Sequence, residues 1–201
     1  MSYVLPALAY NHVNPFSGHL ATTVYPPSFV TEVPLTDMAL RAGPGRTHMY
    51  YNGTPEFKFG EGLSYFTWGL FLEPLSITEY SADNTSIISF LVRVTNLGPT
   101  GSTVGQFSSA PGKKTILAFW RPKFAMSHLA SPRQKLFDYK NILVLSGESQ
   151  DLVFELHVAM LASVDPSGRR VLHLGAYEIA FYNGELEVAV TVQLLGLPVF
   201  V

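Results

Sequence analysis

The residues of this chain best suited to acid–base chemistry are four carboxylates in constrained sequence surroundings: Asp37, Glu61, Asp138 and Asp165. Catalysis by carboxyl groups needs two of them close together, one to donate a proton and one to act as base or nucleophile. Asp37 and Asp165 stand in turn-forming runs, where a carboxylate accepts hydrogen bonds from nearby backbone amides. Asp138 lies between two aromatic residues of an expected strand and is expected to face solvent. The sequence therefore marks no catalytic pair.

The other candidate side chains show no pattern typical of metal binding or of nucleophilic catalysis. The absence of cysteine removes disulfides, thiolate metal sites and cysteine nucleophiles. No histidine has the His-x-x-x-His spacing of a zinc-binding helix, and no serine lies in a Gly-x-Ser-x-Gly turn. We therefore expect no metal, no cofactor and no catalytic residue. The histidines considered are His12, His19, His48, His128, His157 and His173.

The composition is that of a folded, globular protein. Of the 201 residues, 47% are hydrophobic and 14% are charged, and the net charge is −2. Disorder needs low hydrophobicity with high net charge, and binding to nucleic acids or anionic membranes needs a basic surface. No run approaches the roughly 18 apolar residues of a membrane-spanning helix. We therefore expect neither nucleic acid nor membrane among the partners.

Two features of the sequence bear on where the protein is located and on whether it is glycosylated. The first residues, Met-Ser-Tyr-Val-Leu-Pro, lack the basic start of a signal peptide, so none is predicted. Asn52 and Asn84 each begin an Asn-x-Ser/Thr sequon and are the glycosylation candidates. Pro55, directly after the first sequon, disfavours its use.

Turn-forming residues divide the chain into two stretches. Up to about residue 62 they are so frequent that the pattern predicts an irregular extension. From residue 63 the pattern changes to short strands separated by turns. The predicted strands are 65–68, 71–79, 86–95, 115–120, 134–144, 151–158, 170–173, 176–182 and 186–194.

Two local signals within the second stretch are specific. Ile88, Phe90, Val92 and Val94 fall on one face of a strand, with Ser89 and Arg93 on the other, and residues 96–99 are expected to end it. The dipeptide Asn183-Gly184 lies between two alternating runs and predicts a hairpin. The predicted fold is all-β: an immunoglobulin- or fibronectin type III-like β-sandwich with a long irregular N-terminal extension.

Several motifs, taken in order, resemble glycoside hydrolase family 3. Residues 14–20, Asn-Pro-Phe-Ser-Gly-His-Leu, look like the signature that closes the family's α/β sandwich domain. Pro44-Gly45-Arg46-Thr47 resembles a segment of the β-xylosidase branch, and residues 59–65, Phe-Gly-Glu-Gly-Leu-Ser-Tyr, are similar to the start of the C-terminal domain. Further similarity lies in residues 25–29, 33–41, 92–98, 145–149 and 172–177. The chain thus resembles the C-terminal segment of a family 3 enzyme, closest to β-xylosidases.

The resemblance implies a division into three parts. Residues 1–22 would be the remnant of an α/β sandwich domain, 23–62 an irregular connection between domains, and 63–201 a fibronectin type III-like domain. The catalytic aspartate and glutamate of the family would lie upstream of Met1, so this chain alone is expected to be inactive. Phe16, inserted in the first motif, and the long stretch 101–114 depart from the family pattern and fit a truncated gene product or a diverged paralogue.

The function implied is that of a non-catalytic accessory segment that stabilises catalytic domains, its expected partners. The intact enzyme, extracellular in this family, would hydrolyse terminal β-xylosyl or related residues of plant cell-wall-type oligosaccharides. Five residues are expected to dock the connection on the catalytic domains: Arg46, Tyr50, Tyr51, Phe57 and Asp37.

Arg46 is singled out because a guanidinium in a Pro-Gly turn can pair with a carboxylate or with two carbonyl groups. A surface arginine, a bridge to a neighbouring domain and a substrate contact all remain open for it. The tyrosines and Phe57 would add apolar contact area. Asp37 is either a turn cap or a sugar contact in the intact enzyme.

A competing hypothesis is a stand-alone β-sandwich that binds carbohydrate or protein. It needs a coplanar strip of exposed aromatic side chains, and the candidates are Trp68, Tyr80, Trp120 and Phe124. The strand patterns around the two tryptophans favour core packing instead.

Overall fold

The computed structural model describes residues 39–40, 45–55, 57–83, 85–100, 110–123, 132–165 and 167–197, and the backbone of residues 199–200. The chain forms two compact units, Met1–Glu61 and Gly62–Val201. The predicted remnant at residues 1–22 lies outside the described residues. In the described part of the chain no helix combines the length and apolar character needed to span a bilayer.

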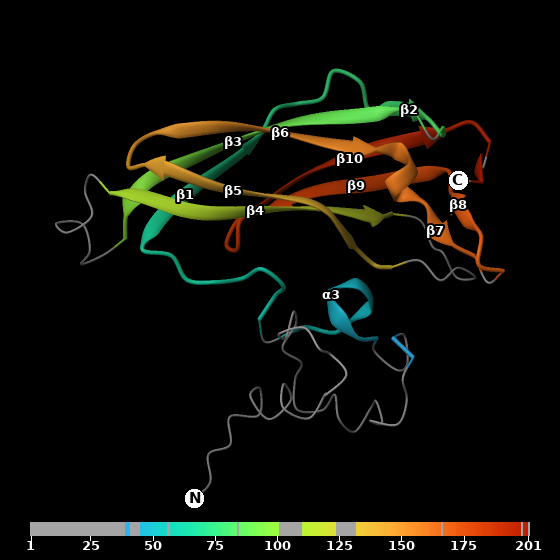
Figure 1. Cartoon of the computed structure of the whole chain (residues 1–201), viewed down its shortest axis with the longest axis horizontal. Coiled ribbons are helices and arrows are strands. Elements are labelled where there is room, and N and C mark those ends of the chain that lie inside the picture. The colour runs from blue at the N-terminus through green and yellow to red at the C-terminus, as the bar shows by residue number, and fades with distance from the viewer. Residues whose placement is uncertain are drawn as a thin grey trace, which may run out of the picture. The chain divides into compact units, whose positions relative to one another are not determined.

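The unit Gly62–Val201 is a β-sandwich of two curled sheets (Figure 1). One sheet has the strand order β1-β3-β6 and the other β2-β10-β9-β4-β5. The first contains β1 (Phe66–Leu72), β3 (Ile87–Pro99) and β6 (Ser149–His157). The second contains β2 (Glu79–Ser81), β4 (Pro111–Pro122), β5 (Lys135–Leu145), β9 (Gly175–Tyr182) and β10 (Glu187–Leu195). The prediction of an all-β sandwich is confirmed.

Neighbouring strands in both sheets run antiparallel, except that β2 pairs with β10 in parallel. A third, small sheet has the order β11-β8-β7, with β7 at Ser163–Val164, β8 at Arg170–Leu172 and β11 at Val199–Phe200. The short 3₁₀ helix η2 (Val158–Leu161) follows β6. The predicted hairpin at Asn183-Gly184 is confirmed, since it joins the antiparallel strands β9 and β10.

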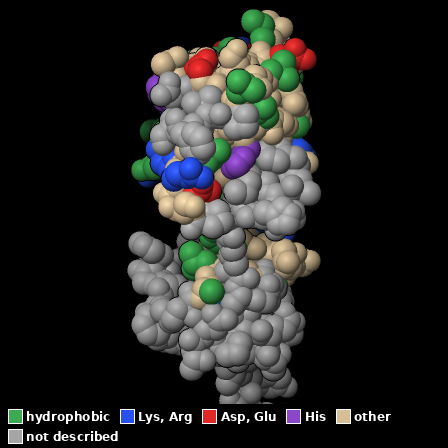
Figure 2. Space-filling model, turned by 90° about the vertical axis from the view of Figure 1, so that its right-hand side faces the viewer, with side chains coloured by type: hydrophobic (Ala, Val, Ile, Leu, Met, Phe, Trp, Pro, Cys, Tyr) green, Lys and Arg blue, Asp and Glu red, His purple; other side chains and the backbone are tan. Residues whose placement is uncertain are grey.

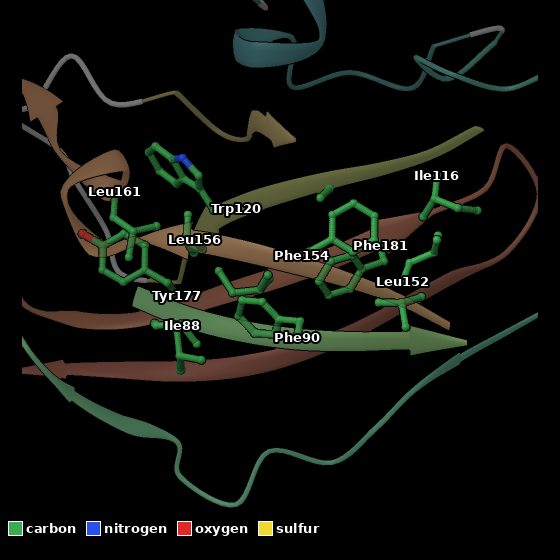
Figure 3. Packing of buried hydrophobic residues seen from close by; sticks show 14 of the residues in the cluster. Ile88, Phe90, Ile116, Trp120, Leu152, Phe154, Leu156, Leu161, Tyr177 and Phe181 are labelled. Carbon is green, nitrogen blue, oxygen red and sulfur yellow. The ribbon is translucent and has the colours of Figure 1, made fainter. Parts of the chain in front are cut away.

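The core lies between the two large sheets and is built by residues at alternate strand positions. Ile88, Phe90, Val92 and Val94 of β3 are at most 1% exposed, which confirms the predicted buried face. Phe181 of β9 packs against Phe90 and against Phe154 of β6, with ring centroids 5.4 and 5.0 Å apart (Figure 3). These rings join side chains from both sheets, so the sandwich has one continuous core.

One strand prediction and one turn prediction are wrong. The strand predicted at 71–79 does not form as one element: residues 71–72 end β1, residue 79 begins β2, and between them Pro74 lacks the N–H that a sheet strand needs. The turn expected at 96–99 is also wrong, because β3 runs on to Pro99 in pairing with β1. A register shift between Thr67 and Trp68 and a positive φ of 107° at Gly98 accommodate this continuation.

Asn96 explains why β3 continues through a turn-forming sequence. Its side chain is fully buried, and its Nδ2 donates to the Val144 carbonyl of β5, 2.9 Å away in the other sheet. Its Oδ1 accepts a hydrogen bond from the Gly98 backbone N–H at 3.0 Å. A residue that usually favours turns here satisfies the Gly98 N–H two residues on and ties the two sheets together through Val144.

The surface of the described residues carries both signs of charge. In the face drawn in Figure 2, basic and acidic side chains are interspersed, without one broad basic patch among the coloured atoms. This agrees with the small net charge of −2.

Candidate functional site

The predicted docking residue Arg46 lies in a tightly folded turn of the unit Met1–Glu61. Gly45 has a φ of 82°, and a Cβ added there would lie 2.2 Å from the Tyr50 carbonyl oxygen. Only glycine fits this position without displacing the backbone. The Arg46 backbone N–H donates to the Leu40 carbonyl at 2.7 Å, and the short helix α3 (Thr47–Tyr50) follows.

Thr47, directly after Arg46, has a backbone conformation that β-branched residues rarely adopt. Its φ is 63°, and its Oγ1 accepts a hydrogen bond from the Met49 backbone N–H at 3.3 Å. Such a conformation costs on the order of 1–3 kcal/mol and persists only where surrounding contacts fix it. The turn at Gly45–Tyr51 is therefore held in one shape by its neighbours.

Three of the five predicted docking residues are buried or half-buried. Arg46 is 9% exposed and Tyr51 is 7% exposed, so Arg46 is not a surface arginine. Tyr50 is half-buried. The Tyr51 backbone N–H donates to the Thr47 carbonyl at 3.0 Å, which closes the turn of α3. The side chains at 46 and 51 are thus largely shielded from solvent.

The other predicted site residues have different surroundings. Phe57 is 57% exposed and therefore available for contact. Asn52 is exposed, as a glycosylation site must be. Asp37 and Asn84 lie outside the described residues.

Sequence reasoning missed a pair of rings near Arg46. The His48 imidazole stacks on Phe59, with centroids 4.1 Å apart and planes 15° apart. Burial lowers the pKa of His48, so the imidazole is neutral at pH 7 and stacks as an uncharged ring. Phe59 is the first residue of a motif that the sequence did mark, but nothing in the sequence pairs it with His48.

The carboxylates considered for acid–base chemistry make local contacts. Glu61 Oε2 accepts the Lys58 backbone N–H at 2.9 Å. Asp165 accepts the backbone N–H groups of Ser167 and Arg169 at 2.8 and 2.9 Å, so its predicted turn role is confirmed. Asp138, with a side chain 36% exposed, lies 4.0 Å from the Lys140 ammonium group. It lies on the side of β5 that carries Ile142 and Val144, so the expectation that it faces solvent is wrong. The described residues contain no cluster of three or more potential metal ligands.

The aromatic residues proposed for sugar stacking do not form an exposed strip. Trp68 is 2% exposed and Trp120 is 1% exposed, and both belong to the core. Tyr80 is half-buried and its hydroxyl donates to the Ile77 carbonyl at 2.8 Å. Phe124 lies outside the described residues. The tryptophans therefore contribute to packing, as their strand patterns favoured.

A charged network on the second sheet was also missed by sequence reasoning. Arg121 of β4 hydrogen-bonds Glu178 of β9 at 3.0 Å and both carboxylate oxygens of Glu187 of β10 at 2.7 and 2.8 Å. Lys123 pairs with Glu178 as well. Hydrogen bonding to Glu187 raises the pKa of Arg121 against the effect of burial. The network joins three neighbouring strands and neutralises its own charges, so it stabilises structure rather than offering a reactive group.

These features define the class: a β-sandwich in which the described carboxylates Glu61, Asp138 and Asp165 make local contacts. No family model matches the sequence. The chain is 30% identical, over 200 residues, to the exo-1,4-β-xylosidase xlnD of Emericella nidulans, covering 90% of this chain and 23% of that enzyme. It is 30% identical to β-D-xylosidase 1 of Arabidopsis thaliana, covering 92% of this chain and 26% of that protein.

A solved structure agrees with these relatives. The structure of a GH3 exo-β-xylosidase (XlnD), in complex with a xylobiose aziridine activity-based probe, matches with a TM-score of 0.70 and 26% identity. The match covers 89% of this chain and 24% of that enzyme. The chain is a homologue of the C-terminal segment of glycoside hydrolase family 3 β-xylosidases. It spans about a quarter of the length of the curated relatives that it matches.

Proposed function

We propose that this chain is the non-catalytic C-terminal accessory segment of a β-xylosidase-type family 3 glycoside hydrolase, and that it stabilises the enzyme's catalytic domains. The main support is the match to the xylosidases, which covers nearly the whole length of this chain but only about a quarter of each xylosidase. The local turn and ion-pair roles of Glu61, Asp138 and Asp165 support a non-catalytic role.

In this proposal the chain has three parts. Residues 1–22 are the end of an α/β domain, 23–62 are the connection, and 63–201 are a fibronectin type III-like domain. The strand orders β1-β3-β6 and β2-β10-β9-β4-β5 support the last assignment. Apart from the three-residue parallel strand β2, they form two antiparallel sheets of three and four strands, the usual plan of such sandwiches.

The connection is proposed to dock on the catalytic domains through Arg46, Tyr50, Tyr51, Phe57 and Asp37. The fixed turn supports this role, because a preorganised turn loses little conformational entropy when it binds. The exposed ring of Phe57 offers apolar area next to it in sequence.

The complete enzyme is proposed to be extracellular and to remove terminal β-xylosyl or related residues from plant cell-wall-type oligosaccharides. The names of the relatives, an exo-1,4-β-xylosidase and a β-D-xylosidase, support this substrate class. In an extracellular enzyme Asn52 and Asn84 would be the candidate glycosylation sites.

Activity of the isolated chain is the first test. The 201-residue chain should not hydrolyse aryl β-xylosides. Turnover that persists through purification and is abolished by Asp138→Asn or Asp165→Asn would contradict the non-catalytic assignment.

A chimera tests the stabilising role. The solved exo-β-xylosidase XlnD is truncated before its matched segment, and this chain is fused in place of that segment. The chimera should keep xylosidase activity at a temperature that inactivates the truncated enzyme. Arg46→Ala should remove part of the gain, whereas Lys58→Ala, at an exposed position of the same unit, should not. A chimera no more stable than the truncated enzyme would contradict the proposal.

A further inference from the structure

The edge strand β5 presents an apolar stripe on its outer face. Tyr139, Leu143 and Leu145 are 58%, 64% and 46% exposed, and they alternate with the core residues Ile142 and Val144. Three large apolar side chains at alternating positions on a water-facing side of a strand leave apolar area uncovered. We call Tyr139, Leu143 and Leu145 the β5 stripe.

The surroundings of the β5 stripe carry little charge. Across the pairing with β4, Tyr139 lies opposite Leu117, Leu143 opposite Lys113 and Leu145 opposite Pro111. Asn141 lies between Tyr139 and Leu143 on the same side of β5, and its Oδ1 accepts a hydrogen bond from the Thr115 hydroxyl at 2.6 Å. Lys113 is exposed and is the one charged residue among these paired positions. A complementary surface would be apolar, with a carboxylate opposite Lys113.

Further along, the same side of the sheet is already closed to solvent. Phe119 of β4 and Ala180 and Tyr182 of β9 are 2%, 0% and 7% exposed, although they alternate with residues of the sandwich core. The apolar character of this side of the sheet therefore extends beyond the β5 stripe.

The outer face of the other sheet, unlike that of β5, carries cross-strand polar pairs. There Arg93 of β3 is bound by both carboxylate oxygens of Asp151 of β6, and the hydroxyls of Thr95 and Ser149 lie 2.8 Å apart. These pairs interleave with exposed apolar residues such as Val153, which is 52% exposed. Cross-strand polar pairs of this kind suit a face that stays in water.

The edge of β5 is guarded against pairing with another strand. Asp138 and Lys140 share the side of β5 that carries Ile142 and Val144, and the Lys140 ammonium group lies 5.4 Å from the centre of the Phe154 ring in the other sheet. Inward-pointing charges on an edge strand disfavour added strands. An occupant would therefore pack on the face of β5 rather than extend the sheet.

We infer that the β5 stripe is the surface through which the sandwich packs against the catalytic part of the complete enzyme. This rests on the proposed function. The occupant is the remaining length of the enzyme, because the relatives extend well beyond the quarter of their length that this chain matches. A second copy of this chain would instead bring two Lys113 ammonium groups to the same contact.

The XlnD chimera tests this inference through a double variant. Leu143→Ser with Leu145→Ser should shorten the half-life of xylosidase activity at a fixed high temperature by about tenfold or more, because the packing of both leucines is lost. A tenfold change corresponds to about 1.4 kcal/mol of lost stabilisation. The matched control is Ile87→Ser with Val153→Ser on the other sheet, where Ile87 is 47% exposed. The control should leave the half-life within about twofold, as for solvent-exposed substitutions.

The outcomes separate the inference from the proposed function. Stabilisation by the wild-type chain that the β5 double variant leaves intact would overturn the inference alone. Failure of the wild-type chain to stabilise the chimera would overturn the proposed function. Equal losses from the β5 and control variants would also overturn the inference.

A second measurement uses the isolated 201-residue chain. The wild type should bind the dye ANS through its exposed apolar surface, and its light scattering should rise with protein concentration as the chain associates. The β5 double variant should lose at least half of both signals, while its urea midpoint stays unchanged. Absence of both signals in the wild type would contradict the inference. A discrete wild-type dimer that the variant abolishes, with a chimera that it does not affect, would assign the stripe to a second copy and overturn the inference.

Discussion

The sandwich and the turn around Arg46 reach order in different ways. In the sandwich, alternating apolar residues from both sheets share one core, and residues such as Phe90, Phe154 and Phe181 support one another. In the turn, the path of the chain depends on the backbone itself. Gly45 and Thr47 have positive φ angles, and the Arg46 backbone N–H donates to the Leu40 carbonyl. The sandwich is therefore stabilised by summed apolar burial, whereas the turn depends on the backbone conformation of a few residues.

The largest effect is expected from a cavity in the sandwich core. Phe154→Ala should reduce the free energy of unfolding of the sandwich by about 3–5 kcal/mol, because Phe154 is fully buried against Phe181. Urea denaturation followed by circular dichroism measures this loss. Val153→Ala, at the exposed neighbouring position, should change it by less than about 0.5 kcal/mol. Similar losses for both variants would contradict the described core.

A smaller and strictly local effect is expected at Gly45. Gly45→Ala places a Cβ 2.2 Å from the Tyr50 carbonyl oxygen at a φ of 82°, and the strained turn should open more easily by about 1–2 kcal/mol or more. Hydrogen exchange at the amides of Arg46 and Tyr51 should accelerate about fivefold or more, while exchange in the core strands stays unchanged. Gly62→Ala is the control, because a Cβ added at Gly62 would have no atom within 4 Å. Loss of protection throughout the sandwich would contradict the separation of the two regions.

Asn96 tests a place where the sandwich core also relies on a polar side chain. Asn96→Ala leaves the Val144 carbonyl and the Gly98 N–H without the bonds that Asn96 supplies, at a cost of about 1–3 kcal/mol. Asn141→Ala should cost less, since Asn141 is exposed. Equal urea midpoints for the Asn96 variant and the wild type would show that the side-chain bonds of Asn96 are dispensable.

A modest dependence on pH is expected from the turns of the sandwich. Hydrogen bonds from backbone amides lower the pKa of Asp83 and of Asp165, and the bond from Arg93 lowers the pKa of Asp151. Because the folded pKa lies below the unfolded value of about 3.9, this stabilisation is present above that value and is lost as pH falls through the folded pKa. Urea midpoints should therefore decline on acidification below about pH 5, and the decline should be shallower in Asp165→Asn. A decline of unchanged slope in that variant would remove Asp165 from the explanation.

Local patterns predict the sandwich well because its strands obey a local rule. The alternation in β3 identifies the buried face, and Asn183-Gly184 identifies a hairpin without any knowledge of the partner strands. The continuation of β3 past residue 95 could not be predicted, because it depends on the bond from Asn96 to Val144 in the other sheet. Long-range contacts decide such positions.

The candidate site is harder to predict for the same reason. The sequence marks Arg46 by its Pro-Gly context, yet its burial depends on the fold of the turn. The His48–Phe59 stack and the pairing of Arg121 with Glu187 join residues whose spacing carries no periodic signal. The motifs shared with family 3 place the segment without revealing these contacts.

Limited proteolysis tests most directly whether the sandwich is self-contained and the connection needs a partner. In the isolated chain, the first cuts should fall between Thr22 and Gly62 and leave a resistant fragment that begins near Leu63, identified by mass spectrometry. In the XlnD chimera the same stretch should resist cleavage, and Arg46→Ala should weaken that protection. A connection as resistant as the sandwich in the isolated monomeric chain would contradict the account and favour a self-contained module.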